Sequence, residues 1–239
     1  PIIIICFLGA VIYSNTFLCS FHLDDNNSIV PNLAIRNVYN LRNIWDFWPS
    51  RFLTYLTLAV NYHFHKLDVW GYHFFNLAVH LASAVLVWYF MLLTFSTPAL
   101  RKEKISRHSR LIALFTGLVF VSSPIQTQGV TYVVQRAVSM ATLFYLSSLV
   151  LYIKSRLLPE EESPSEPRVF YYAGSLIAAG LAMFTKEMTI TLPFMIWLYE
   201  FSFLPCAGGR RINWKHLIPF FLTLFIIPLT MILTRSVNI

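Results

Sequence analysis

The sequence predicts an all-α polytopic membrane protein, and three observations carry this prediction. Hydrophobic residues make up 56% of the 239-residue chain and charged residues only 12%, whereas a soluble domain has about 25% charged residues. The mean hydropathy is +0.60. Long apolar runs alternate with short connections, and basic residues gather in some of these connections. A net charge of +7 would indicate nucleic acid for a soluble domain, but this placement indicates membrane orientation. We therefore expect the lipid bilayer, and no nucleic acid, as a partner.

A spanning helix needs about 20 mainly apolar residues. Several runs approach that length and predict about seven transmembrane helices. They cover residues 1–19, 73–96, 110–123, 132–153, 169–184, 189–204 and 217–234. We expect 1–19 to be the first span, 20–72 an outer loop, and 73–239 to hold the second to seventh spans. The chain opens without Met inside one apolar run and stops just after another, so we expect a fragment of a longer polytopic protein.

The connection 20–72 is far longer than the roughly 2–8 residues that usually join helices. Its second half, Arg51–Leu67, places apolar and aromatic side chains at helical spacing, and further Trp and Tyr residues flank it. This composition is typical of a helix that lies in the membrane interface. An aromatic belt explains the aromatic residues equally well, but not the length of the loop, and long loops are usually functional.

Basic residues mark three connections that lie on one side of the membrane if every run spans once. By the positive-inside rule this side is cytoplasmic, and we expect Glu200 at that interface. The opposite, periplasmic or luminal side then receives residues 20–72 and the connections around 124–136 and 186–187. The basic residues are Arg101, Lys102, Lys104, Arg107, Arg110, Lys154, Arg156, Arg168, Arg210, Arg211 and Lys215.

Two adjacent carboxylates, Asp24 and Asp25, follow the first apolar run directly. Because charge is costly in hydrocarbon, the pair must face water or a cavity within the protein. An ordinary loop would place them there too. Adjacent carboxylates raise each other's pKa, which suits one of them to act as a general base near neutral pH.

The second apolar run carries a polar stripe. His73, Asn76 and His80 are three and four residues apart, and Ser83 continues the series, so all four share one helix face. Such a stripe in a membrane helix normally faces a cavity or the bundle interior. Hydrogen bonding between helices is the other interpretation, because Asn and His also supply it. Two histidines do not make a zinc site, which needs three or four ligands. No cofactor is certain from the sequence, and a divalent metal is possible but not indicated.

Two further positions place cations on the outer side. Arg136 lies in the first turns of the run 132–153, where a guanidinium beside free backbone N–H groups suits an anion; snorkelling to the interface explains it equally well. Lys186 and Glu187 form a short outer connection, either as an ion pair or with Lys186 beside a phosphate.

Taken together, two carboxylates and two cations on one face suit transfer of a group from a lipid-linked phosphate. A carboxylate would deprotonate an acceptor hydroxyl, and the cations would stabilise the departing phosphate.

Several stretches in order resemble one family. They are the Asp24–Asp25 pair, LTYLTLAVNYHFHKLDVWGYHFFNLAVH, SSPIQTQGVTYVVQRAVSMATLFYL and AMFTKEMTITLPFMIWLYEF. The chain resembles, over nearly its whole length, the membrane part of the transmembrane and tetratricopeptide-repeat O-mannosyltransferase-like proteins, which are GT-C glycosyltransferases. The ordered set of motifs is specific, although no single one is.

The resemblance implies a GT-C-type bundle that takes a polyprenyl- or dolichyl-phosphate sugar, possibly mannose, and inverts the sugar carbon. It implies a protein Ser or Thr hydroxyl as acceptor, with Asp24 or Asp25 as catalytic base. Arg136 matches the arginine expected near the donor phosphate, and Lys186–Glu187 the family's Lys-Glu pair. His73, Asn76 and His80 match its GYHxxNxxxH helix. Later spans and any tetratricopeptide repeats would lie beyond this chain.

Two departures from the family pattern concern the segment before Arg136. The family usually has His-Pro where this chain has Ser123-Pro124, and Glu where it has Gln128, which puts activity or acceptor choice in question. A transporter or a non-catalytic scaffold is the rival from another class, but a transporter would hold its binding groups near the bilayer midplane. A GT-C enzyme that acts on lipid or glycan acceptors is the second rival.

Overall fold

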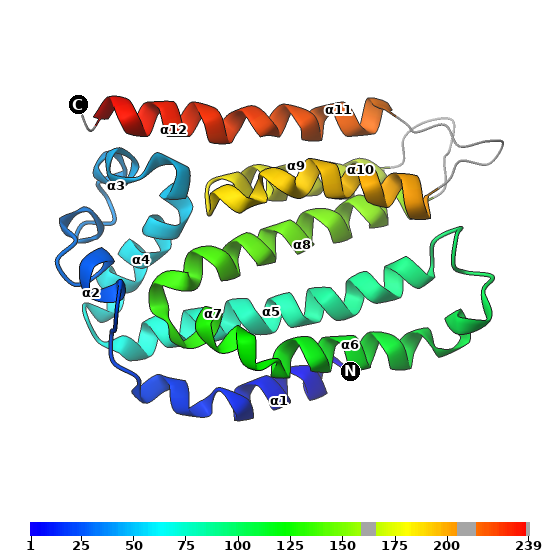
Figure 1. Cartoon of the computed structure of the whole chain (residues 1–239), viewed down its shortest axis with the longest axis horizontal. Coiled ribbons are helices and arrows are strands. Elements are labelled where there is room, and N and C mark those ends of the chain that lie inside the picture. The colour runs from blue at the N-terminus through cyan, green and yellow to red at the C-terminus, as the bar shows by residue number, and fades with distance from the viewer. Residues whose placement is uncertain (159–165, 205–213, 238–239) are drawn as a thin grey trace.

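The computed structural model describes residues 1–158, 166–204 and 214–237, with no strand among them. Its main helices lie side by side along the longest dimension of the molecule (Figure 1). The α-helices are α1 (Ile2–Ile12), α2 (Asp25–Ser28), α3 (Leu41–Phe47), α4 (Phe52–His65), α5 (Val69–Phe95), α6 (Ser109–Ser122), α7 (Thr127–Thr131), α8 (Arg136–Leu157), α9 (Glu166–Met183), α10 (Leu192–Phe203), α11 (Trp214–Leu222) and α12 (Ile226–Val237).

Short 3₁₀ helices connect or extend these elements. They are η1 (Ser14–Leu18), η2 (Leu33–Ile35), η3 (Pro49–Arg51), η4 (Lys104–His108), η5 (Pro124–Gln126), η6 (Val133–Gln135), η7 (Glu187–Thr191) and η8 (Thr223–Phe225). The all-α prediction is confirmed for the described residues.

The structure does not confirm the seven spans that the sequence predicts. Within the described residues, three helical stretches are long and apolar enough to cross a membrane: Val69–Phe95, Val133–Leu157 and Trp214–Leu233. A fourth is possible if Lys104–Ser122 and Pro124–Thr131, which meet at a 49° bend, act as one. Seven spans are not confirmed, because helix formation divides several apolar runs. The 11-residue α1 and the 12-residue α10 reach only about 16–18 Å, against a hydrocarbon core of about 30 Å.

Two clusters of packed side chains join the main helices, and α5 contributes residues to both. On one side, α1 packs against α5 and α6 through Ile5, Ala84 and Val121. Helices α1 and α5 approach closely at Gly9, where an added Cβ would lie 2.4 Å from a Leu81 methyl carbon. Small residues permit such close helix packing in membrane bundles. On the other side, a larger cluster joins α8, α9, α10 and α11 around Tyr152, Ile196 and Phe220.

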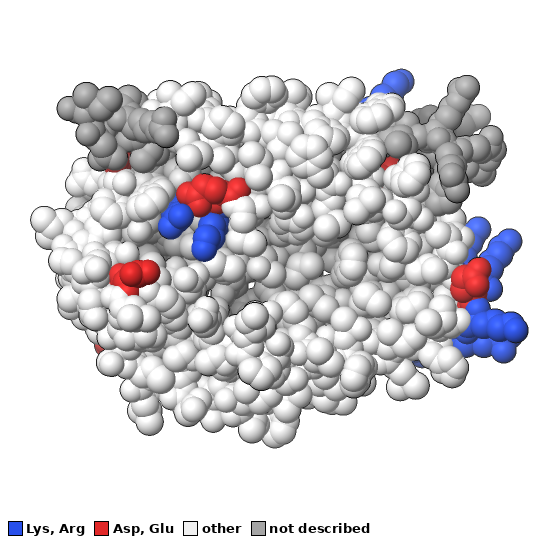
Figure 2. Space-filling model, viewed as in Figure 1, with Lys and Arg blue, Asp and Glu red and all other residues white. Residues whose placement is uncertain are grey.

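The two ends of the bundle differ in charge. We call the end where α2, α3, α4, α7 and η7 gather the aspartate end, and the end that holds the α5–α6 connection the basic end (Figure 1). Figure 2 shows Lys and Arg crowded at the basic end and a broad uncharged face between it and a small charged group toward the aspartate end. Glu200 lies on α10 but is buried, where its carboxylate accepts hydrogen bonds from Arg156 and Tyr152.

A labelling experiment tests the orientation. Basic connections stay cytoplasmic, so Lys104→Cys should react with a membrane-impermeant maleimide only from the cytoplasmic side, and Asn43→Cys only from the other. The background is the full-length protein in which Cys6, Cys19, Cys206 and every cysteine outside this chain are replaced by serine. Labelling of both positions from one side would contradict this arrangement of the two ends.

Candidate functional site

The aspartate end brings together segments that are far apart in the sequence. Residues 20–68 cover the beginnings of α5 and α8, and η7 closes one side. A core of Ile29, Ile44, Tyr55, Tyr72 and Val133 holds the loop helices against the bundle. A helix occupies Phe52–His65, within the stretch where the aromatic spacing indicates one.

Asp25, the first residue of the short helix α2, is fully buried although the segment 20–68 lies outside the main helix bundle. One carboxylate oxygen accepts a hydrogen bond from the backbone N–H of Val134 at 2.7 Å, and the other accepts a longer one from the N–H of His22 at 3.4 Å. The Val134 N–H belongs to η6, directly before α8, where free N–H groups and the helix dipole favour a negative charge. Burial raises the pKa of Asp25, while these backbone hydrogen bonds oppose the rise.

Asp24 is exposed beside its buried neighbour. Its backbone N–H donates to the Tyr132 hydroxyl at 2.9 Å, and the Tyr132 ring stacks on His22 with centroids 4.9 Å apart. Leu23, just before it, has a positive φ of 49°, which is unfavourable for a residue with a side chain. Such strain persists where surrounding contacts impose it, often at functional sites. The two aspartates therefore face different surroundings: one anchors the loop and the other meets solvent.

The four polar residues of the α5 stripe are all buried, and His73, Asn76 and His80 each contact a different segment. His73 Nε2 lies 2.9 Å from the Cys19 carbonyl, and His80 Nε2 lies 3.4 Å from the Val121 carbonyl. Asn76 donates weakly to the Val130 and Val133 carbonyls, both at 3.4 Å. In this structure the stripe joins α5 to the segments that frame the aspartate end, as interhelical hydrogen bonding predicts.

Arg136 is also fully buried, between α8 and α5. Its Nε donates to Asn76 Oδ1 at 2.8 Å and its Nη2 to the Tyr72 carbonyl at 3.1 Å, while the guanidinium carbon lies 4.3 Å from the Phe75 ring centroid. Among the described residues Nη1 has no partner. The guanidinium thus fixes the helix seam with two nitrogens and keeps one donor unused.

Glu187 is held by residues of the outer loop that the sequence patterns did not single out. Arg51 donates to both carboxylate oxygens at 3.1 Å, and the Ser50 hydroxyl donates to one of them at 2.9 Å. The Arg51 guanidinium also lies over the Trp48 ring, 4.5 Å from its centroid. The only sequence feature that could have indicated this contact is an arginine within the aromatic segment WPSRF. Together these contacts fasten η7 to the loop.

The charges near η7 affect each other. Burial opposes ionisation of Glu187, but the hydrogen bonds and charge of Arg51 outweigh it and lower the pKa of Glu187. Burial lowers the pKa of the half-buried Lys186, and the Arg51 charge lowers it further, while Glu187 partly offsets both. Arg51 is therefore the ion-pair partner of Glu187, and Lys186 lies beside that pair.

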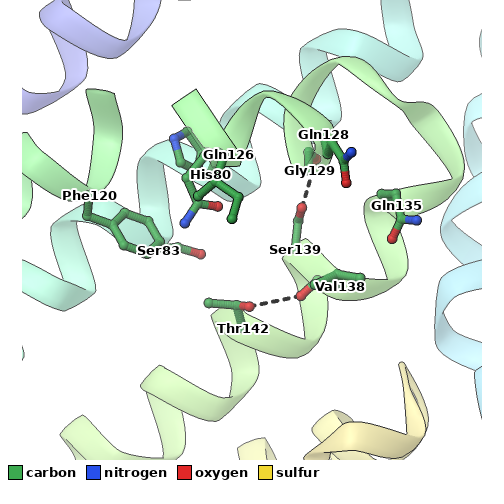
Figure 3. Close-up of a pocket in the computed structure, with 11 residues that line it drawn as sticks. His80, Ser83, Phe120, Gln126, Gln128, Gly129, Gln135, Val138, Ser139 and Thr142 are labelled. Atoms are coloured by element: carbon green, nitrogen blue, oxygen red, sulfur yellow. Dashed lines mark hydrogen bonds between the residues drawn. The ribbon is translucent and has the colours of Figure 1, made fainter. Parts of the chain in front are cut away.

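Gln128 and His80 line a separate pocket of about 310 Å³ between α5, α6, α7 and α8. In Figure 3, His80 and Gln126 border one side and Gln128 and Gln135 another. No group of three or more His, Cys, Asp or Glu side chains suited to a metal occurs in the part of the chain that the structure describes.

These features define a class: a helical membrane protein with a carboxylate pair and a charged cluster at the ends of its helices. Comparison with proteins of known family narrows this class. The chain is 30% identical to the protein O-mannosyl-transferase Tmtc3 of Drosophila melanogaster over 92% of its own length. It is 28% identical to human TMTC2 over 89% and to human TMTC4 over 77% of its length.

Over most of its length the chain is therefore a relative of the TMTC O-mannosyl-transferases, which confirms the family resemblance. It spans about a quarter of these relatives, namely 26%, 24% and 27% of their lengths. No family model matches the chain, and no solved structure matches it.

The Arg51–Glu187 pair gives a prediction about the outer loop. Glu187→Gln should destabilise the loop locally by roughly 1–3 kcal/mol, because a partly buried, bidentate contact is lost. Hydrogen exchange of residues 41–65 measures this. Asp46→Asn is the matched control, since its pair with Arg42 spans 3.6 Å on the surface and such pairs contribute little.

The pH dependence follows from the lowered pKa of Glu187. A carboxylate with a lowered folded-state pKa stabilises above its unfolded pKa and loses that contribution as pH falls through the folded value. Loop protection should therefore persist at neutral pH and fall in acid below the usual glutamate range. Glu187→Gln should abolish that acid-dependent step. Equal protection in Glu187→Gln and wild type at neutral pH would contradict the tether.

Proposed function

We propose that this chain forms the membrane part of a GT-C-type glycosyltransferase. It transfers a sugar, possibly mannose, from a polyprenyl- or dolichyl-phosphate donor to a Ser or Thr hydroxyl of a protein. The reaction takes place on the periplasmic or luminal face, at the aspartate end. Support comes from the relatives, which are named protein O-mannosyl-transferases, and from apolar helices of spanning length.

The observation that carries the mechanism is the unequal placement of the two aspartates. Asp25 is buried, and both of its oxygens are engaged by backbone N–H groups. Asp24 is exposed and held next to Tyr132. A general base must come within hydrogen-bond reach of the proton that it removes. We therefore assign Asp24 as the base and Asp25 as the positioning residue that fixes the loop on the start of α8.

In the reaction, the acceptor oxygen attacks the anomeric carbon from the face opposite the phosphate. The new C–O bond forms as the bond from that carbon to the phosphate oxygen breaks, so the configuration inverts. The proton of the hydroxyl passes to Asp24, and the polyprenyl phosphate leaves with the bonding electron pair. Preorganised cations stabilise such a leaving group.

Lys186 and Arg136 are the cations proposed to bind the phosphate. Lys186 is half-buried, and the carboxylate of its neighbour Glu187 is bound by Arg51. Arg136 is fully enclosed, but its Nη1 remains without a partner among the described residues. Glu187, His73, Asn76 and His80 hold these elements in place.

Matched aspartate variants test the mechanism in full-length protein. Asp24→Asn should lower kcat by about 10²–10⁴-fold, because general-base assistance is lost, with donor KM and melting temperature unchanged. Asp25→Asn should lower both activity and melting temperature, since it weakens the anchor on Val134. The measurement is transfer of radiolabelled sugar from a polyprenyl phosphate to protein.

Asp46→Asn, an exposed carboxylate of the same loop, is the control and should retain activity. A fully active Asp24→Asn variant would remove Asp24 from the role of base. Label that appears on lipid or glycan would keep the enzyme class and replace the acceptor. Failure of wild type to transfer sugar from any polyprenyl phosphate would favour a transporter or scaffold.

A further inference from the structure

All three glutamines of the chain, Gln126, Gln128 and Gln135, line the pocket between α5, α6, α7 and α8. They come from three different elements, η5, α7 and η6. None of their side-chain amides is hydrogen-bonded to another of the described residues. An amide has two donors and an acceptor, and these three side chains reach the pocket surface, since Gln126 and Gln135 are half-buried and Gln128 is exposed. Their convergence therefore offers several donors and acceptors to a polar ligand.

The rest of the lining specifies the chemistry of that occupant. Hydroxyls of Ser83, Ser139 and Thr142 border the pocket, and those of Ser139 and Thr142 already donate to backbone carbonyls (Figure 3). They therefore offer acceptor lone pairs. His80 and Phe120 stack with centroids 5.4 Å apart and form a flat wall. Amides and hydroxyls beside an aromatic surface match a ring that carries hydroxyl groups on its edge and C–H groups on its face.

Charge excludes the phosphate from this position. No Asp, Glu, Lys or Arg is among the residues that line the pocket. The neighbouring Arg136 contacts Asn76 and Tyr72 instead. A phosphate in such a place would be desolvated without a counter-charge, whereas a neutral polar ligand meets only dipoles. The volume of about 310 Å³ is at the lower end of the range of about 300–1,000 Å³ for small-molecule sites, and so suits one ring.

We propose that this pocket binds one neutral monosaccharide ring. The proposal rests on the proposed function and deepens it, because it separates recognition of the sugar from that of the charged phosphate and from the aspartates. The ring belongs either to the lipid-linked donor or to a sugar already present on an acceptor, and the two sources share the same chemistry.

Kinetics of leucine variants test the pocket in full-length protein. Gln126→Leu and Gln135→Leu remove an amide at similar volume, and each should raise a KM by about five- to tenfold, the effect of one lost hydrogen bond. A rise in donor KM identifies the donor sugar; a rise in acceptor KM identifies the acceptor sugar. Asn43→Leu, which removes an exposed amide on α3, is the matched control and should leave both constants unchanged.

Direct binding separates failure of this proposal from failure of the proposed function. Saturation-transfer NMR with methyl α-mannopyranoside should give a signal for wild type in nanodiscs that is weakened in Gln135→Leu and unchanged in Asn43→Leu. Active enzyme whose leucine variants behave like Asn43→Leu overturns the sugar pocket and keeps the transferase. An inactive wild type that still binds the mannoside through Gln135 keeps the pocket and overturns the transferase.

A photoreactive mannoside covers the case in which the leucine variants do not fold. Wild-type protein should be labelled within residues 120–142. Labelling confined to other residues, or none at all, would show that the pocket holds solvent only and would overturn the proposal.

Discussion

The hydrogen bond from the Val134 N–H to the buried Asp25 carboxylate is the contact on which the aspartate end depends. It joins a loop residue to the beginning of α8 across 109 positions of sequence. The N–H groups at a helix beginning lack partners within the helix, so a carboxylate there satisfies a donor and meets the positive end of the dipole. Because Asp25 is bound in this way, Asp24 beside it is presented to solvent.

The position of the Val134 N–H depends in turn on a contact between α5 and α8. The Asn76–Arg136 contact fixes α5 against α8 at the point where η6 ends and α8 begins. Apolar packing alone gives little directional preference between helices in a lipid environment, whereas a buried hydrogen bond specifies one register. The same asparagine contacts the carbonyls of Val130 and Val133. The position of the Val134 N–H, and hence of Asp25, therefore follows from this helix seam.

The sequence predicted the helices best where a run was long and uninterrupted. The runs 73–96 and 132–153 correspond to α5 and α8. The shorter runs mislead because hydropathy does not show where a helix turns into 3₁₀ structure: residues 1–19 become α1 and η1, and 189–204 become part of η7 and α10. The face shared by His73, Asn76 and His80 follows from helical periodicity, so it could be read from spacing alone.

The partners of these residues could not be read in the same way. Arg51 is 136 positions from Glu187, and nothing local links them. Arg136 lies near the start of its helix as expected, but its burial depends on Asn76 and Tyr72, which only the tertiary fold supplies. The sequence singles out Gln128 as a departure from the family pattern, but it does not single out Gln126 or Gln135. These two residues join Gln128 in one pocket because the chain bends between α6 and α7.

Charged and neutral side chains lie in different places, as the proposed lipid-linked sugar donor would require. Arg51, Lys186 and Glu187 form a charged group around η7, and the aspartates sit at the start of α8. The glutamine pocket, by contrast, has no charged side chain in its lining. In a medium of low dielectric constant a charge acts over a longer range than in water. Keeping the charged groups at the helix ends therefore leaves a neutral space between the helices, where a ligand is selected by hydrogen bonds and shape.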